Sequence, residues 1–297
     1  MNAVVRSILF VPGDSERKIE KSRASSADAL VLDLEDSVAS ARKSIAREMT
    51  AAFLKDRSLK KGAVQWVRIN PVNTPEALQD LAAVVAGGPA CILQPKVGGP
   101  ADVRRLSFYL DAFETREGVP IGTTKIVPVV TETPNAPFSL GAYASAGLSR
   151  LYGLTWGAED LSAAMGAATN RDADGGLALT YRIVRSLTLL AAKACGVEAV
   201  DTVYPDYRNL EALKQSCLIS RREGFSGRFA VHPDQVEAIN EAFSPSVDDV
   251  AFAERVVAAF AASDAGVVGV DGMMLDKPHL TQAEKVLAMR DAFGARQ

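Results

Sequence analysis

Two apolar runs of the sequence end in acidic residues. Residues 125–131 are followed by Glu132, and residues 151–158 are followed by Glu159 and Asp160. A strand buried on both faces tolerates a charge only where it leaves the core, so these carboxylates should lie at a rim. Glu132 and Asp160 should then be neighbours, and an all-oxygen pair suits Mg²⁺, or alternatively Mn²⁺, with waters completing the coordination. An ion pair with an arginine or a helix cap is the alternative role for either acid.

Arg68 stands inside another apolar, strand-like run. A buried guanidinium must pair with an acid or face an anionic ligand, because an unpaired buried charge is costly. Its planar fork suits a carboxylate or an enolate oxygen. Asp33, Glu35 and Asp36 offer the alternative partners, and both roles can hold at once. Asp33 and Glu35 alternate and so share one side of their strand. These acids could also hold metal-bound water or cap a helix starting near Val38.

The remaining candidates are basic residues and histidines. Residues 16–23 form a basic helix start, and Lys21 or Arg17 could bind ligand phosphates there, although a solvated helix face is the plainer interpretation. The chain has only two histidines, His232 and His279. A His-rich zinc site is therefore excluded, and acid–base chemistry falls mainly to carboxylates.

Composition narrows the class of protein. The chain has 297 residues, of which 48% are hydrophobic and 23% charged, and its net charge is −3. No basic stripe is interleaved with aromatics, so neither nucleic acid nor a membrane surface is expected as a partner. The start of the chain is strand-like rather than a signal peptide. Three scattered cysteines without a CxxC pair favour reduced thiols in a cytoplasmic protein.

Short β-branched runs alternate with longer amphipathic stretches along the chain, which predicts a (β/α)₈ TIM barrel in which each strand is followed by a helix. An open, doubly wound sheet is the alternative. The predicted strands are residues 7–11, 29–34, 64–69, 91–94, 125–130, 150–155, 199–203 and 228–231. Predicted helices cover residues 16–25, 38–54, 75–85, 101–113, 180–195 and 207–222.

The end of the chain follows a different pattern. A helix is predicted at residues 247–262, a hairpin around the Asp-Gly pair at 271–272, and a last helix at 282–293. We therefore expect a catalytic barrel over residues 1–235 and a small helix–hairpin–helix extension over 236–297.

Ten short motifs occur in order along nearly the whole chain. They are RSILFVPG (6–13), ALVLDLEDSV (29–38), VRINP (67–71), QPK (94–96), TET (131–133), WGAEDL (156–161), AVDTVY (199–204), VHPDQ (231–235), NEAFSP (240–245) and DGMMLD (271–276). This series resembles the citrate lyase β-subunit-like group of the HpcH/HpaI aldolase family, which includes malyl-, methylmalyl- and citramalyl-CoA lyases.

The resemblance implies a Mg²⁺-dependent enzyme that cleaves or forms a carbon–carbon bond beside a CoA thioester. Matched by motif, Glu132 and Asp160 become the metal ligands. Arg68 becomes the group that contacts the 2-oxo acid portion of the substrate and the developing enolate. Phe10 and Lys21 fall where relatives hold the CoA moiety.

The same resemblance implies further roles near the C-terminus. Glu159 and His232 would line the substrate pocket. Asp276 would be a catalytic acid that reaches the active site of a neighbouring subunit, which implies a homo-oligomer built from trimers.

Some residues depart from the family pattern. Gln94 replaces the usual leucine, and Trp156 lies in the second metal motif, so we expect a substrate other than that of citrate lyase itself. The presence of Asp276 favours a free 3-hydroxyacyl-CoA that yields a 2-oxo acid and an acyl-CoA. The alternatives are a Mg²⁺-dependent thioesterase or malate-synthase-like activity, a citrate lyase β subunit acting on a carrier-bound citryl group, and an aldolase acting on 2-oxo acids without CoA.

Overall fold

The computed structural model describes residues 5–56, 62–263 and 265–294. Within these ranges, eight strands form one sheet in the order β5-β4-β3-β2-β1-β8-β7-β6. The strands are β1 (Ser7–Pro12), β2 (Ala29–Asp33), β3 (Val64–Arg68), β4 (Cys91–Gln94), β5 (Lys125–Pro128), β6 (Gly153–Thr155), β7 (Glu198–Asp201) and β8 (Gly227–Ala230). Neighbouring strands pair in parallel. Parallel bridges Ile126↔Leu151 and Val129↔Thr155 join the two end strands, so the sheet closes into a barrel and the open-sheet alternative is wrong.

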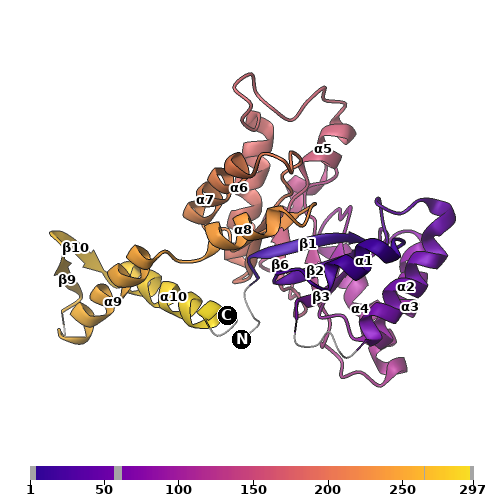
Figure 1. The fold of residues 1–297 in the computed structure, drawn as a ribbon, viewed down its shortest axis with the longest axis horizontal. Coiled ribbons are helices and arrows are strands. Elements are labelled where there is room, and N and C mark those ends of the chain that lie inside the picture. The colour runs from indigo at the N-terminus through magenta and orange to yellow at the C-terminus, as the bar shows by residue number, and fades with distance from the viewer. Residues whose placement is uncertain (1–4, 57–61, 264, 295–297) are drawn as a thin grey trace. The chain divides into compact units, whose positions relative to one another are not determined.

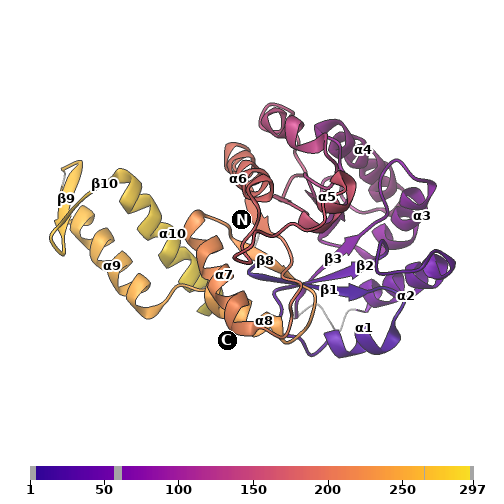
Figure 2. The same ribbon diagram turned by 90° about the horizontal axis from the view of Figure 1, so that it is seen from above.

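Helices lie outside the strands of the barrel (Figures 1 and 2). They are α1 (Glu16–Ser22), α2 (Lys43–Lys55), α3 (Pro75–Val84), α4 (Pro100–Glu117), α5 (Ala158–Met165), α6 (Leu179–Ala194), α7 (Leu210–Glu223) and α8 (Gln235–Phe243). Three 3₁₀ helices also occur in the described chain, η1 (Ser40–Arg42), η3 (Val85–Gly87) and η4 (Ala136–Ala142). The predicted (β/α)₈ barrel is confirmed.

The structure corrects the prediction at two places. No α-helix follows β5 directly in the described chain; η4 stands there, with Pro137 in its first turn, where a missing N–H is tolerated. The helix expected from Val38 begins only at Lys43, since the Asp33 carboxylate accepts the N–H groups of Glu35 and Ser37 and holds a turn. A helix was predicted after each strand, but no residue range had been given for α5 or α8.

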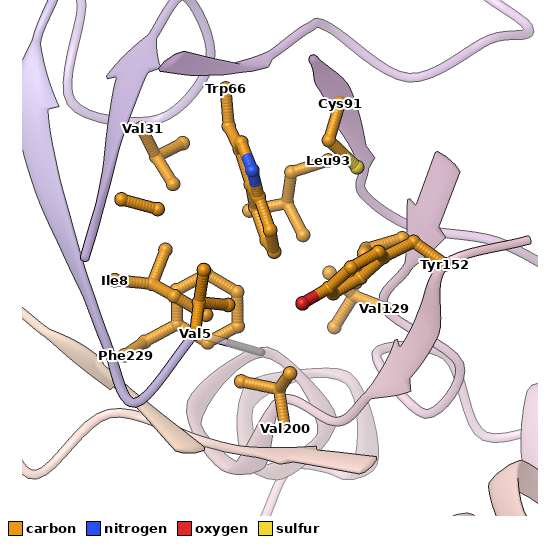
Figure 3. Packing of buried hydrophobic residues seen from close by; sticks show 12 residues of the cluster. Val5, Ile8, Val31, Trp66, Cys91, Leu93, Val129, Tyr152, Val200 and Phe229 are labelled. Carbon is orange, nitrogen blue, oxygen red and sulfur yellow. The ribbon is translucent and has the colours of Figure 1, made fainter. Parts of the chain in front are cut away.

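The barrel interior is a packed apolar core. Trp66, Tyr152 and Phe229 point toward one another from different sides of the barrel (Figure 3), with the Trp66 and Tyr152 rings edge to face at 5.4 Å between centroids. Because apolar side chains fill the interior, as in other barrels of this type, charged side chains that face inward from the strands must lie at the barrel ends.

Residues from Asn240 onward belong to a second compact unit, and residues 5–239 belong to the barrel unit. The second unit contains α9 (Val247–Ala261), β9 (Val267–Val270), β10 (Met273–Asp276) and α10 (Lys277–Gly294). Strands β9 and β10 form the antiparallel hairpin predicted from the Asp-Gly pair, and Asp271 and Gly272 both have the positive φ that a tight hairpin turn requires. Among the described residues, no helix combines the length and the apolar character that a membrane crossing needs.

Candidate active site

Arg68 and Asp33 are paired by the register of the barrel strands. They are Cα partners at the ends of β3 and β2. Arg68 Nε and Nη2 each donate to one Asp33 oxygen at 2.7 Å, and Nη1 lies 3.0 Å from Glu35 Oε2. The guanidinium carbon also lies 4.9 Å from the centre of the Phe10 ring. These contacts take at most three of the five N–H donors, so Arg68 is held rigidly and can still bind an anion.

The pKa values of the two acids beside Arg68 are shifted in opposite directions. For Asp33, burial would raise the pKa, but the hydrogen bonds and charge of Arg68 outweigh it and the pKa stays below its ordinary value. For Glu35, burial is the larger effect and raises the pKa despite Arg68 and Lys96. Both predicted roles of Arg68 therefore remain compatible with its position: it is ion-paired, and it lines a cavity.

Glu132 is a buried carboxylate with too little positive charge around it. Its residue is only 6% exposed, and its Oε2 accepts the backbone N–H of Lys96. Burial, together with the negative charges of Asp160 and Glu35, raises the pKa of Glu132 to about 8, against the smaller opposing effects of Lys96 and Arg68. A carboxylate in this state would gain stability from a bound cation.

Gly157 makes room for the Glu132 side chain. A Cβ at position 157 would lie 2.8 Å from Glu132 Cγ, closer than carbon atoms normally approach. Glycine is therefore required there if Glu132 is to keep its position.

The sequence placed Glu159 and Asp160 at the end of a strand, and this prediction is wrong. They lie in the first turn of α5, because β6 ends at Thr155 and helix α5 starts at Ala158. Acidic side chains are favourable in the first turn of a helix. Asp160 is partly exposed and coupled electrostatically to Glu132, whereas the exposed Glu159 accepts a hydrogen bond from Asn170 at 2.9 Å.

Lys96 is a site residue to which the sequence assigned no role. Its ammonium lies 2.6 Å from Glu35 Oε1, 2.9 Å from Asp36 Oδ2 and 3.8 Å from Asp160 Oδ1. Asp36 thus contacts Lys96 and not Arg68 in the described ion pairs. The one signal in the sequence was the Pro-Lys pair directly after a predicted strand.

We call Asp33, Glu35, Asp36, Glu132 and Asp160 the acid cluster. In the ion pairs of the described chain, four of these carboxylates contact two cations, Arg68 and Lys96, whereas Glu132 accepts only the backbone N–H of Lys96. The excess of negative charge and the oxygen-only donors fit a hard divalent cation. No group of three or more His, Cys, Asp or Glu residues arranged to hold a metal occurs in the described ranges. Two carboxylates are nevertheless typical of Mg²⁺, which keeps several waters or substrate oxygens.

Two cavities meet at Arg68 and Phe10. The smaller, of about 90 Å³, is lined by Glu132, Glu159 and Asp160 among others. The larger, of about 530 Å³, is lined by three basic residues of α1 and, among others, by His232 and Asp33. The basic residues are Arg17, Lys18 and Lys21.

The larger cavity brings together Phe10, Lys21 and His232, whereas Glu159, which was expected in the same pocket as His232, lines the smaller cavity; their roles in binding stay predictions. The His232 ring stacks on Tyr207 at 4.6 Å between centroids. Apolar rings beside several cations suit a ligand that carries both an organic chain and phosphates.

Asp276 lies in the second unit, at the end of β10. Its side chain is 53% exposed, and its Oδ1 lies 2.6 Å from His279 Nδ1. Its expected role in a neighbouring subunit stays a prediction.

The raised pKa of Glu132 predicts how stability depends on pH. The folded protein holds this proton up to about pH 8, whereas an ordinary glutamate loses it near 4.5. The free energy of unfolding of the metal-free protein should therefore fall as pH rises through this window. Glu132→Gln should remove this fall. Between about pH 5 and 9, the free energy of unfolding of the variant should therefore rise relative to that of the wild type by more than about 1.4 kcal/mol, the equivalent of one pKa unit. Urea unfolding in EDTA measures this; parallel pH profiles would contradict it.

The chain is similar to several known proteins. The chain is 33% identical over 293 residues to a (3S)-malyl-CoA thioesterase of Cereibacter sphaeroides, covering 98% of this chain and 96% of the relative. It is 30% identical to the mitochondrial citramalyl-CoA lyase of Rattus norvegicus, covering 96% of this chain and 85% of the relative. The solved structure of CitE from Mycobacterium tuberculosis with magnesium, acetoacetate and coenzyme A matches with a TM-score of 0.79 and 32% identity, covering 98% of this chain and 100% of that one.

Most of the motifs that suggested the family lie in the barrel, within the region that the family model matches, and the last two lie beyond it. Residues 6–233 match the model of the HpcH/HpaI aldolase/citrate lyase family. The chain therefore belongs to the HpcH/HpaI aldolase/citrate lyase family of enzymes.

Proposed function

We propose that this protein is a Mg²⁺-dependent carbon–carbon lyase that acts on a 3-hydroxyacyl-CoA such as malyl-, methylmalyl- or citramalyl-CoA. It would release a 2-oxo acid and an acyl-CoA, or join them in the reverse direction. The observation that carries the proposal is the under-neutralised, buried Glu132 beside Asp160, in a small cavity that Arg68 links to a larger, basic one. Relatives named as CoA-ester enzymes, and a CitE structure with magnesium and coenzyme A, support the assignment.

Glu132 and Asp160 would hold the metal. When bound, Mg²⁺ would act as a Lewis acid toward the oxygens of the 2-oxo acid fragment. The Gly157 gap and the Lys96 N–H keep the Glu132 carboxylate in place for this role. Burial excludes water around Glu132 and so strengthens every electrostatic interaction there.

Arg68 would stabilise the charge that develops on the thioester. In cleavage, a base removes the hydroxyl proton, the carbon–carbon bond breaks, and its electron pair passes to the thioester as an enolate. The N–H groups of Arg68 that its acids leave available would donate to the enolate oxygen. Asp276 of a neighbouring subunit would return a proton to the enolate carbon, or remove it in the condensing direction. Lys21, Phe10 and His232 would hold the CoA moiety in the larger cavity.

A screen of CoA esters tests the proposal. With Mg²⁺ and malyl-, methylmalyl- or citramalyl-CoA, we expect a 2-oxo acid to appear while the thioester product stays intact. A hydrazine reagent detects the oxo acid and a thiol reagent detects free CoA. The likeness to a (3S)-malyl-CoA thioesterase makes hydrolysis the second candidate, and thiol release would favour it. Turnover of 2-oxo acid aldols without CoA would contradict both.

Asp276→Asn tests the proton transfer between subunits. We expect it to lower kcat at least about 100-fold, the scale of a lost acid–base group, while Mg²⁺ affinity is unchanged. Asp291→Asn, a change in α10 of the same unit, is the control. Coexpression of Asp276→Asn with Glu132→Gln chains should restore part of the activity if the acid acts in a neighbour. Full activity of Asp276→Asn would remove this residue from the mechanism.

Gly157→Ala tests whether the position of Glu132, the proposed metal ligand, depends on the missing side chain at residue 157. The added Cβ must displace Glu132, so we expect Mg²⁺ affinity to fall by about tenfold or more, the scale seen for disturbed metal-supporting residues. Gly141→Ala is the matched control, because a Cβ there meets no described atom within 4 Å. Calorimetric Mg²⁺ titration of both variants measures the effect, and equal affinities would show that Glu132 does not depend on this gap.

A further inference from the structure

Lys96 contacts the site through both its backbone and its side chain. Its N–H donates to Glu132 Oε2, and its ammonium lies 2.6 Å from Glu35 Oε1 and 2.9 Å from Asp36 Oδ2. The same nitrogen lies 3.8 Å from Asp160 Oδ1. A single lysine therefore approaches both proposed metal ligands and two further acids of the cluster.

A lysine that only ends a strand in solvent does not account for these contacts. The Lys96 side chain is 33% exposed, and its backbone has a φ of +51°. This left-handed conformation is unfavourable for a residue other than glycine and persists only where surrounding contacts hold it. For Lys96, these contacts join its backbone N–H to Glu132 and its ammonium to Glu35 and Asp36.

We propose that the Lys96 ammonium is a tethered counter-cation of the metal site, an inference that rests on the proposed Mg²⁺-dependent function. Its single positive charge offsets part of the negative charge of Glu35 and Asp36, and thereby reduces the negative potential that a divalent cation meets at Glu132 and Asp160. Mg²⁺ therefore binds more weakly than it would to the same carboxylates without the lysine. Lys96 is a positioning residue that sets the charge of the site and does not itself react with substrate.

The backbone and side-chain contributions of Lys96 can be separated. Any residue at position 96 keeps the N–H that holds Glu132, so a neutral side chain changes the charge and leaves that hydrogen bond available. Lys96→Met removes the charge at similar length. Lys96→Asn is a second neutral variant, and asparagine adopts positive φ more readily than most residues. Lys96→Arg keeps the charge and is the control.

Calorimetric titration with MgCl₂ tests the inference, using full-length protein at fixed ionic strength. The titration is done at about pH 9, so that proton release from Glu132 contributes little. We expect both neutral variants to bind Mg²⁺ about fivefold or more tightly than the wild type. This is the scale of the repulsion that a unit positive charge a few ångströms away exerts on a cation in a well-solvated site. Lys96→Arg should bind within about twofold of the wild type. Circular dichroism in EDTA establishes that each variant is folded.

The outcomes separate this inference from the proposed function. Equal or weaker Mg²⁺ binding by folded Lys96→Met or Lys96→Asn would overturn the counter-cation role. A wild-type protein that binds no Mg²⁺ would instead contradict the metal site itself. Raised salt should shrink the difference between neutral and charged variants, because it screens the interaction. A difference that salt does not change would also count against the inference.

Discussion

Burying the Glu132 carboxylate beside Asp160 and Glu35 costs free energy that the described contacts only partly recover. The Lys96 N–H and the more distant charge of Arg68 oppose the penalty, yet the pKa still rises to about 8. The residue can remain charged at neutral pH only when more positive charge arrives. In the proposed function, stability, metal binding and chemistry are therefore coupled through this one side chain. Without a bound cation, replacing Glu132 by a neutral residue would stabilise the protein.

The barrel creates this situation by the way its strands pair. Strand register places Asp33 beside Arg68, so the guanidinium is fixed before any substrate binds. The loop after β4 then brings the Lys96 N–H to Glu132, and the turn before α5 passes close enough that only glycine fits at 157. Such preorganisation means that the site does not need to rearrange when negative charge develops on a substrate. Arg68 lines both a small acidic cavity and a larger basic one, where the two parts of the proposed thioester substrate would meet.

Much of the fold and part of the site could be predicted from the pattern of residues alone. The β4 prediction has the observed bounds, and the Asp-Gly pair correctly located the hairpin. Arg68 stood out because a cation inside an apolar run needs a partner. Other features could not be predicted in this way. The apolar run before Glu159 looked like one continuous strand, but it contains a strand, a turn and the start of α5, since apolar residues serve all three when buried.

The sequence by itself determined which residues leave the core and that a parallel barrel gathers them at one end, because hydrophobic patterning and charge burial are local properties. Only the tertiary structure decided which charge meets which. Lys96 is far in sequence from both Glu35 and Glu132, yet it contacts both. Such contacts follow from strand register and barrel closure, which bring distant segments within hydrogen-bond distance and leave no trace in the spacing of the residues.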